Sequence, residues 1–118
     1  MVHMFDRTEL LVGSSGLEIL SRAKVAIFGV GGVGSFVAEA LARSAVGTLV
    51  LVDHDEIDVT NLNRQIHALH STIGLPKVRV MATRIKDINP TCTVEVHQEF
   101  YTPEREDEFS PWDYDYVI

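Results

Sequence analysis

The stretch Lys24-Val25-Ala26-Ile27-Phe28-Gly29-Val30-Gly31-Gly32-Val33-Gly34 joins a short apolar run to a cluster of glycines. Residues 24–28 have the pattern of a buried strand, and residues 35–45 repeat apolar side chains at helical spacing. The glycines therefore lie at a turn that leads from a strand into a helix. In α/β proteins this is the place where a helix N-terminus offers free amides and a partial positive charge to a phosphate.

Each glycine of the turn has an expected role. Gly29 permits the tight turn, Gly31 lets the backbone approach a phosphate closely, and Gly34 lets the helix pack against the strand. We assign Gly32 to the same nucleotide-binding set. Three glycines at this spacing also occur in loops that bind nothing, so the assignment depends on the residues downstream of the turn.

Asp53 supplies that context. Residues 48–52, Thr-Leu-Val-Leu-Val, read as a second strand, and Asp53 comes directly after it, 19 residues after Gly34. A dinucleotide-binding unit carries an acidic ligand for the ribose at about this distance. The order of strand, turn, helix, strand and acid predicts a nucleotide site.

The remaining pattern predicts an α/β fold of the Rossmann-like, doubly wound kind, with a mainly parallel sheet and N-terminal helices. Residues 6–22 read as a helix in two pieces, with a capping-box pattern at Ser15-Gly16-Leu17-Glu18. A third helix is expected to begin at Pro76 and to end at Asn89-Pro90.

Two more strands are expected, at residues 93–97 and 114–118, with a short acidic helix opening at Thr102-Pro103. The last strand ends at Ile118 without a helix to cover it, and ligands bind beyond the carboxyl ends of such strands. We therefore expect residues 1–118 to be the N-terminal part of one domain, with part of the active site beyond Ile118.

Composition narrows the function classes. The chain has 118 residues, 46% of them hydrophobic, with a formal net charge of −7 and one cysteine, Cys92. No apolar run is long enough to span a membrane, and the N-terminus has no signal-peptide pattern, so a cytoplasmic protein is expected. Residues 99–118 hold seven acidic residues and one basic residue, which we interpret as a solvated surface.

Asn61, Arg64, Gln65 and Lys77 separate two kinds of nucleotide. NAD and ATP would both use the glycines and Asp53. The pyrophosphate of NAD carries two negative charges, which helix-end amides can largely satisfy, whereas ATP carries about four and calls for Lys, Arg and Mg²⁺. Two cations with two amides, all downstream of the second strand, therefore favour ATP.

Several motifs occur here in one order: Gly-x-Gly-Gly-x-Gly, Asp53-x-Asp55, Asn61-x-x-Arg64-Gln65, Gly74-x-Pro76-Lys77 and Asn89-Pro90. From about Phe5 to Ile118 the chain resembles the superfamily of ubiquitin-activating enzymes and their bacterial relatives in molybdopterin and thiamine synthesis. The sequence of residues 61–69 and 84–92 most resembles that of the branch whose members dehydrate threonylcarbamoyladenosine in tRNA.

The resemblance implies roles for individual residues. Asp53 would bind the ribose hydroxyls, and Arg64 and Lys77 would hold the phosphates with Asn61. Arg7 matches an arginine that such homodimers insert into the ATP site of the partner subunit. The Mg²⁺-binding aspartate of the family would come just after Ile118, so no metal ligand is assigned here. The implied reaction is attack of a substrate carboxylate on the α-phosphorus of ATP.

Three function classes are compatible with these residues. The first is adenylation of threonylcarbamoyladenosine in tRNA, and the second is adenylation of the C-terminus of a ubiquitin-like sulfur carrier. The third is an NAD-dependent oxidoreductase. His67 and His70, three residues apart, offer only two ligands to a metal, and Cys92 has no neighbouring cation placed by sequence to activate its thiol.

Overall fold

The computed structural model describes residues 3–105 and 113–118. Its elements come in the order α1 (Asp6–Arg22), β1 (Lys24–Phe28), α2 (Gly34–Arg43), β2 (Thr48–Val52), the 3₁₀ turn η1 (Val59–Asn61), α3 (Lys77–Ile88), β3 (Thr93–His97) and β4 (Tyr116–Val117). Strands alternate with helices along most of the chain, as the sequence predicts.

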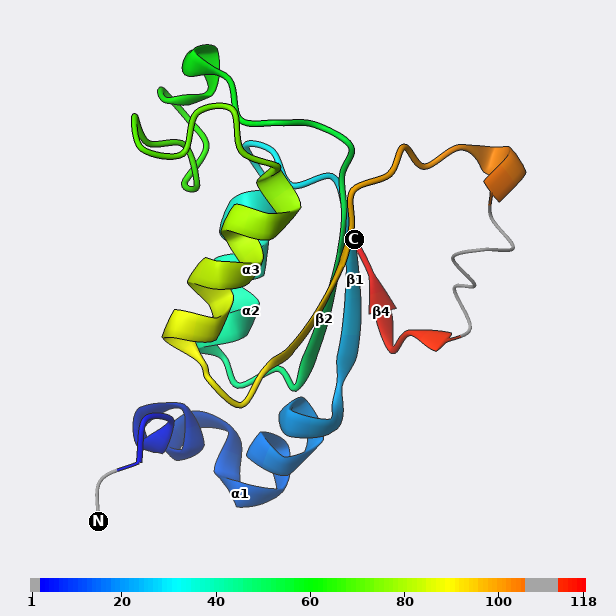
Figure 1. Ribbon diagram of the computed structural model, residues 1–118. Coiled ribbons are helices and arrows are strands. Elements are labelled where there is room, and N and C mark those ends of the chain that lie inside the picture. The colour runs from blue at the N-terminus through cyan, green and yellow to red at the C-terminus, as the bar shows by residue number, and fades with distance from the viewer. Residues whose placement is uncertain (1–2, 106–112) are drawn as a thin grey trace.

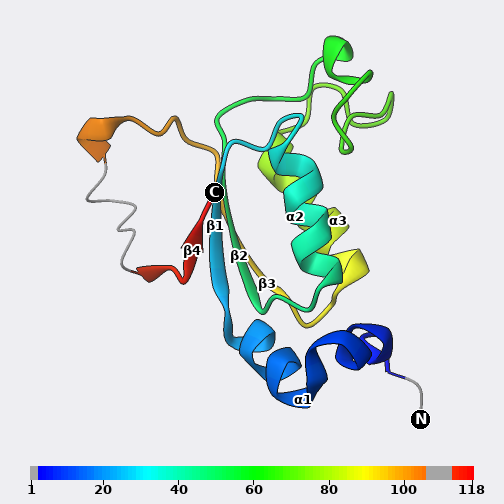
Figure 2. The ribbon, with the colours of Figure 1, turned by 180° about the vertical axis from the view of Figure 1, so that it is seen from behind.

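The four strands form one parallel sheet in the order β3-β2-β1-β4. From β1 the chain moves outward to β3 and then returns to the other side of β1, which is the strand order of a doubly wound sheet. Helices α2 and α3 cover one face, and α1 lies beyond the amino ends of the strands (Figures 1 and 2). The predicted α/β, Rossmann-like class is confirmed.

The core lies between the sheet and helices α2 and α3. Alternate residues of β1 and β2 point into it, together with one stripe of each helix; its members include Val25, Ile27, Leu49, Leu51, Ala38, Ala42, Val78, Met81 and Ile85. Cys92 is fully buried there, and burial raises the pKa of its thiol. Cys92 is therefore a small packing residue in its uncharged form.

The capping box expected at Ser15 is not formed. Gly13, with φ of 75° and ψ of 170°, interrupts α1, so Ser14 and Ser15 already belong to the second helical piece. A capping residue must stand outside the helix, and here Gly13 has that place. The Glu18 carboxylate instead accepts a hydrogen bond from Arg22, one turn further on.

Other boundaries differ slightly from the expectation. Pro76 caps α3 from outside, and the first helical residue is Lys77. Residues 103–105 form a single helical turn, and the rest of the expected acidic helix lies outside the described residues. Strand β4 is shorter than the predicted segment 114–118. In the part of the chain that the structure describes, no helix is both long and apolar enough to cross a bilayer.

The segment between β2 and α3 forms a loop with a closed base, which we call the necked loop (residues 57–75). At the neck, Ile57 N donates to Leu75 O and Gly74 N donates to Ile57 O, both at 2.8 Å. An antiparallel bridge between Glu56 and Pro76 continues the closure on the outside. The neck brings the start of α3 back to the end of β2.

Gly34→Ala should lower the free energy of unfolding by about 1–3 kcal/mol, the usual penalty for overpacking. A Cβ at position 34 would overlap the carbonyl oxygen of Gly29, and a backbone atom cannot rotate away. Gly31→Ala is the matched control, because its Cβ would lie 3.7 Å from Gln65 Nε2, an ordinary contact. Equal urea midpoints for the two variants would contradict the prediction.

Candidate nucleotide site

Gly29 and Gly34 shape the turn after β1. Gly29 has φ of 100°, which favours glycine, and its N–H donates to Val52 O at 2.8 Å, so the turn begins while still joined to β2. Gly34 starts α2 against the Gly29 carbonyl, where no side chain fits. The expectations for these two glycines are confirmed.

Gly31 and Gly32 are explained by neither strain nor crowding. Neither has a positive φ, and a Cβ on Gly32 would lie 3.8 Å from Arg64 Cγ. The missing side chains leave a space between the turn and residues 64–65. Among the described residues, the N–H groups of Gly31, Gly32 and Val33 have no hydrogen-bond acceptor. These free amides, next to the gap that the two missing side chains leave, form a cradle suited to an anion.

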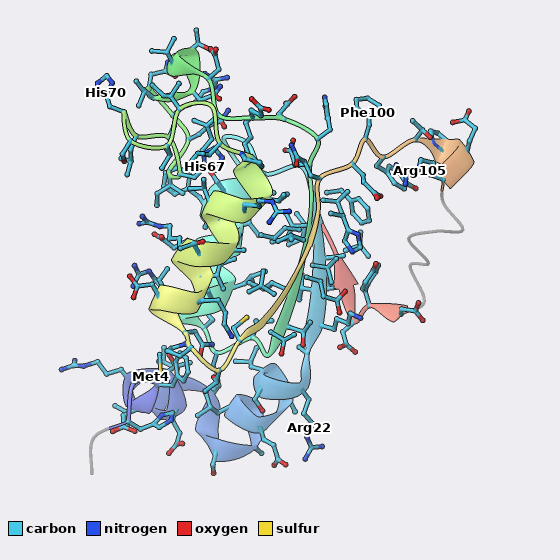
Figure 3. The ribbon with its side chains drawn as sticks, viewed as in Figure 1. Met4, Arg22, His67, His70, Phe100 and Arg105 are labelled. Atoms are coloured by element: carbon cyan, nitrogen blue, oxygen red, sulfur yellow. The ribbon has the colours of Figure 1, made fainter. Side chains whose placement is uncertain are left out.

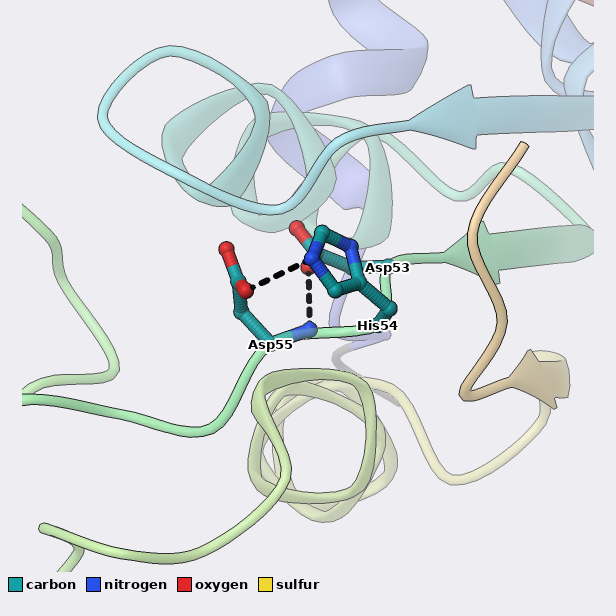
Figure 4. A group of neighbouring side chains, drawn as sticks. All are labelled: Asp53, His54 and Asp55. Atoms are coloured by element: carbon teal, nitrogen blue, oxygen red, sulfur yellow. Dashed lines mark hydrogen bonds and ion pairs between the residues drawn. The ribbon is translucent and has the colours of Figure 1, made fainter. Parts of the chain in front are cut away.

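Asp53 lies at the end of β2, beneath this cradle. Its Oδ2 accepts the N–H of Val30 at 2.7 Å, and its Oδ1 accepts the N–H of Asp55 at 2.8 Å. Figure 4 shows Asp53 with His54 and Asp55 below the turn after β1. Each carboxylate oxygen can accept more than one hydrogen bond, so Asp53 keeps acceptor capacity for ribose hydroxyls.

Lys77 reaches the same place from the start of α3. Its backbone N–H donates to Asp55 O at 3.1 Å, and its largely buried ammonium lies 3.7 Å from Asp55 Oδ2. On the other side, His54 Nε2 lies 3.0 Å from Asp55 Oδ1. Asp55 thus holds Lys77 beside Asp53, and a polyphosphate would compete with Asp55 for the ammonium.

Among the described residues, one group of side chains could surround a metal ion: Asp53, His54 and Asp55. One ligand atom from each of the three lies within 4.8 Å of the other two. These atoms already take part in hydrogen bonds and ion pairs with one another, with Val30 and with Lys77. We assign no metal to them.

Asn61, Arg64 and Gln65 are brought together by η1. The carbonyl of Asn61 accepts the N–H groups of Arg64 and Gln65, and its side chain accepts the N–H of Asp58. Arg64 is exposed; its Nη1 donates to Thr60 O and to Asn63 Oδ1, both at 3.0 Å. Gln65 is buried, and its Oε1 has no partner among the described residues. Arg64 and Gln65 therefore line the cradle.

His67 contacts the glycine turn, a role that its spacing from His70 did not indicate. It points inward from the necked loop, whereas His70 lies at the outer edge (Figure 3). His67 Nε2 lies 2.7 Å from the Val30 carbonyl oxygen, and the residue is 1% exposed. Burial lowers the pKa of His67, and the charge of Lys77 lowers it further, against the hydrogen bond to Val30, which raises it. His67 and His70 do not form a metal pair.

Arg7 is not near the cradle of its own chain. It lies exposed in the first turns of α1, beyond the amino ends of the strands, whereas the cradle lies at their carboxyl ends (Figure 1). The predicted contribution of Arg7 to a site would therefore have to be made in another subunit.

A hollow of about 290 Å³ adjoins Asp53 and Gly29, the first residue of the glycine turn. It is lined by the ends of β1 and β2 and by residues after β3, among them Phe100 and Tyr101. Tyr101 packs on Phe28 with ring centroids 4.9 Å apart, and Phe100 packs edge-on against His54 at 4.6 Å. Its aromatic walls suit a flat ring, and Asp53 both lines this hollow and accepts a hydrogen bond from the glycine turn.

The fold and these residues define a Rossmann-like α/β domain with an anion cradle at the carboxyl edge of its sheet. Residues 5–118 match the model of the ThiF family, and the chain belongs to this family.

Three relatives show the range of the similarity. The chain is 57% identical to the tRNA threonylcarbamoyladenosine dehydratase of Bacillus subtilis. The match covers all 118 residues of this chain and 46% of the B. subtilis protein. It is 46% identical, with a TM-score of 0.95, to the Escherichia coli tRNA N6-threonylcarbamoyladenosine dehydratase in a crystal structure with ATP; the match covers 98% of this chain and 47% of that one. A ubiquitin-like modifier-activating enzyme 5 of Bombyx mori is 40% identical over 80 residues, covering 68% of this chain and 20% of that enzyme. The chain thus spans less than half the length of these relatives.

The free energy of unfolding should depend on pH through His67. Because burial lowers its pKa from about 6.5, the unfolded chain takes up a proton that the folded chain resists. This contribution to stability is complete above pH 6.5 and is lost as the pH falls below it. Urea unfolding between pH 5 and 8 should show a smaller loss in His67→Gln than in wild type, with exposed His70→Gln as the control. Parallel pH profiles for wild type and His67→Gln would contradict this.

Proposed function

We propose that this chain contributes the ATP site of an enzyme that adenylates a carboxylate. The observation that carries the proposal is the cradle itself: unbonded amides of the glycine turn face Arg64 and Gln65 across a space that side chains at positions 31 and 32 would fill. The E. coli relative of the ThiF family has been crystallised with ATP, which favours ATP over NAD as the nucleotide.

Different residues of the site would bind the ribose, the base and the phosphates of ATP. Asp53 would accept the ribose hydroxyls, and the hollow beside it would hold the base. The glycine amides, Arg64 and Lys77 would hold the phosphates, with Asn61 fixing the segment that carries Arg64 and Gln65. Positioned cations stabilise the charge that develops during phosphoryl transfer. Mg²⁺ is part of the proposal as the partner of the triphosphate, and none of the described residues is assigned to it.

The proposed reaction proceeds in two steps. A carboxylate oxygen of the substrate attacks the α-phosphorus, the bond from that phosphorus to the bridging oxygen breaks, and pyrophosphate leaves. In the second step, a nucleophile within the substrate attacks the activated carbonyl carbon, a ring closes and AMP leaves. The atoms of one water are removed from the substrate overall.

We propose threonylcarbamoyladenosine in tRNA as the substrate, because the B. subtilis and E. coli relatives are named for its dehydration. The cytoplasmic location expected from the sequence is compatible with a tRNA substrate. The acidic net charge is an objection, since tRNA binding relies on Lys and Arg. Of the basic residues on helix α3, Arg84 pairs with Glu39 and Lys86 donates to the carbonyls of Pro90 and Cys92, whereas Arg79 is exposed.

The alternative substrate is the C-terminus of a ubiquitin-like sulfur-carrier protein; its support is at the level of the family, in which the B. mori relative is named for activating a ubiquitin-like modifier. The same site residues would serve both reactions, because both begin with a carboxylate and ATP. The proposal for the whole protein is one adenylation domain, with residues 1–118 as its N-terminal part, acting as a homodimer in which Arg7 reaches the site of the neighbouring subunit.

The substrate is tested by incubating the full-length enzyme with ATP, Mg²⁺ and tRNA that carries threonylcarbamoyladenosine. We expect ATP consumption and loss of the mass of one water from the modified nucleoside. Matched tRNA without the modification is the control. Equal ATP consumption with both tRNAs, or an unchanged nucleoside mass, would contradict the tRNA proposal; pyrophosphate release with a ubiquitin-like carrier would then support the alternative.

Arg7 is tested by subunit mixing. Arg7→Ala and Asp53→Ala homodimers should both be nearly inactive, because each disables both sites. A heterodimer of the two variants should regain one site, built from the Asp53 of one subunit and the Arg7 of the other, by the symmetry of a twofold interface. The activity should approach half that of wild type per dimer. Heterodimers that form without regaining activity would contradict this arrangement.

A further inference from the structure

We propose that His67 is a positioning residue that orients the peptide between Val30 and Gly31, so that the Gly31 N–H points into the anion cradle. This inference rests on the proposed function, because it concerns how the cradle is prepared for a phosphate. The contacts that support it surround one residue of the turn, Val30.

The side chain, the N–H and the carbonyl group of Val30 are each fixed by a contact. Its side chain is fully buried in the core, its N–H donates to Asp53 Oδ2, and its carbonyl oxygen lies 2.7 Å from His67 Nε2. The two side chains come from different segments, Asp53 from the end of β2 and His67 from the necked loop. Both polar groups of a single residue are thus fixed by the parts of the chain that also supply the site.

The hydrogen bond determines the tautomer of His67. A carbonyl oxygen can only accept, so Nε2 carries the proton and Nδ1 has the free lone pair. Nδ1 is buried without a partner among the described residues. An unpaired buried polar atom is unfavourable, and an aromatic hydrocarbon ring would fill the space without it. The benefit of an imidazole at this place must therefore come from its bond to the Val30 carbonyl.

That bond sets the direction of the next amide. No peptide bond of the described residues is cis. In a planar trans peptide the C=O and the N–H point in opposite directions. With the Val30 carbonyl turned toward His67, the Gly31 N–H must point away from His67, and it has no acceptor among the described residues. The imidazole therefore keeps the Gly31 N–H as a free donor on the side of the peptide opposite His67.

Glycine makes this control necessary. Rotation of a peptide by half a turn changes ψ of the residue before it and φ of the residue after it, and glycine at position 31 accepts either sign of φ. Without His67, the peptide could turn its carbonyl oxygen toward the phosphate and its N–H inward. A carbonyl oxygen repels an anion, so the flipped turn would bind polyphosphate poorly.

The test compares nucleotides with and without phosphate. His67→Phe keeps an aromatic ring without the donor, His67→Gln restores an N–H donor at similar reach, and exposed His70→Gln is the matched control. In calorimetric and NMR titrations, His67→Phe should bind ATP about tenfold more weakly, the loss of roughly one hydrogen bond to a charged acceptor. Its affinity for adenosine should change less than about twofold, and His67→Gln should recover most of the ATP affinity.

An ATP affinity of His67→Phe equal to that of wild type would overturn the positioning inference. Wild type that binds no ATP would overturn the proposed function. Wild type that binds ATP while His67→Phe loses ATP and adenosine equally would show a merely structural role and overturn the positioning inference. If His67→Phe fails to fold, ¹⁵N NMR of the wild-type imidazole decides the matter: a proton on Nε2 together with a large ATP-induced shift of the Gly31 amide supports the inference, and a proton on Nδ1 or an unmoved amide overturns it.

Discussion

The contact between Gly34 and the Gly29 carbonyl is the constraint on which the site depends. It brings the first turn of α2 against the end of β1, closer than any residue with a side chain could approach. The helix therefore starts at the carboxyl edge of the sheet, with the unbonded amides of the turn beside it. Since β1 and β2 are paired in register up to Phe28 and Val52, Asp53 emerges at the same edge. The register of two strands thus places a carboxylate next to the amides.

The parts that could be predicted from the sequence are those with local patterns. Apolar runs revealed the strands, a helix-spaced stripe revealed α3, and the order of the glycines and Asp53 predicted that the turn and the carboxylate lie at the same edge of the sheet. The contact of His67 could not be recognised in this way, because its partner, Val30, is 37 residues away and accepts through a backbone atom that no sequence pattern marks. A spacing of three residues between His67 and His70 would put them on one face of a helix, but the chain at this point is a series of turns.

Charge is a second property that the sequence could not resolve. The sequence counts basic residues, whereas ligands respond to those that remain free. Lys77 is held by Asp55, Arg84 by Glu39 and Lys86 by two carbonyl oxygens. Arg64 differs, since only its Nη1 bonds to neighbours among the described residues. Lys77, Arg84 and Lys86 are therefore less available to a ligand than a count of basic residues in the sequence suggests.

The neck of the loop at residues 57–75 makes its outer tip structurally independent of the sheet. Hydrogen bonds between Ile57, Gly74 and Leu75 close the loop at its base, so the path of β2 into α3 is the same whatever the tip contains. The entropic cost of closing a loop grows only with the logarithm of its length, so adding residues at the tip costs little stability. The inner side of the loop, which carries Arg64, Gln65 and His67, is bound to the glycine turn, whereas the tip near His70 is exposed. Insertions and exchanges of sequence can therefore accumulate at the tip while the inner side keeps its geometry, so the surface of this loop can diversify without a change in the residues that face the glycine turn.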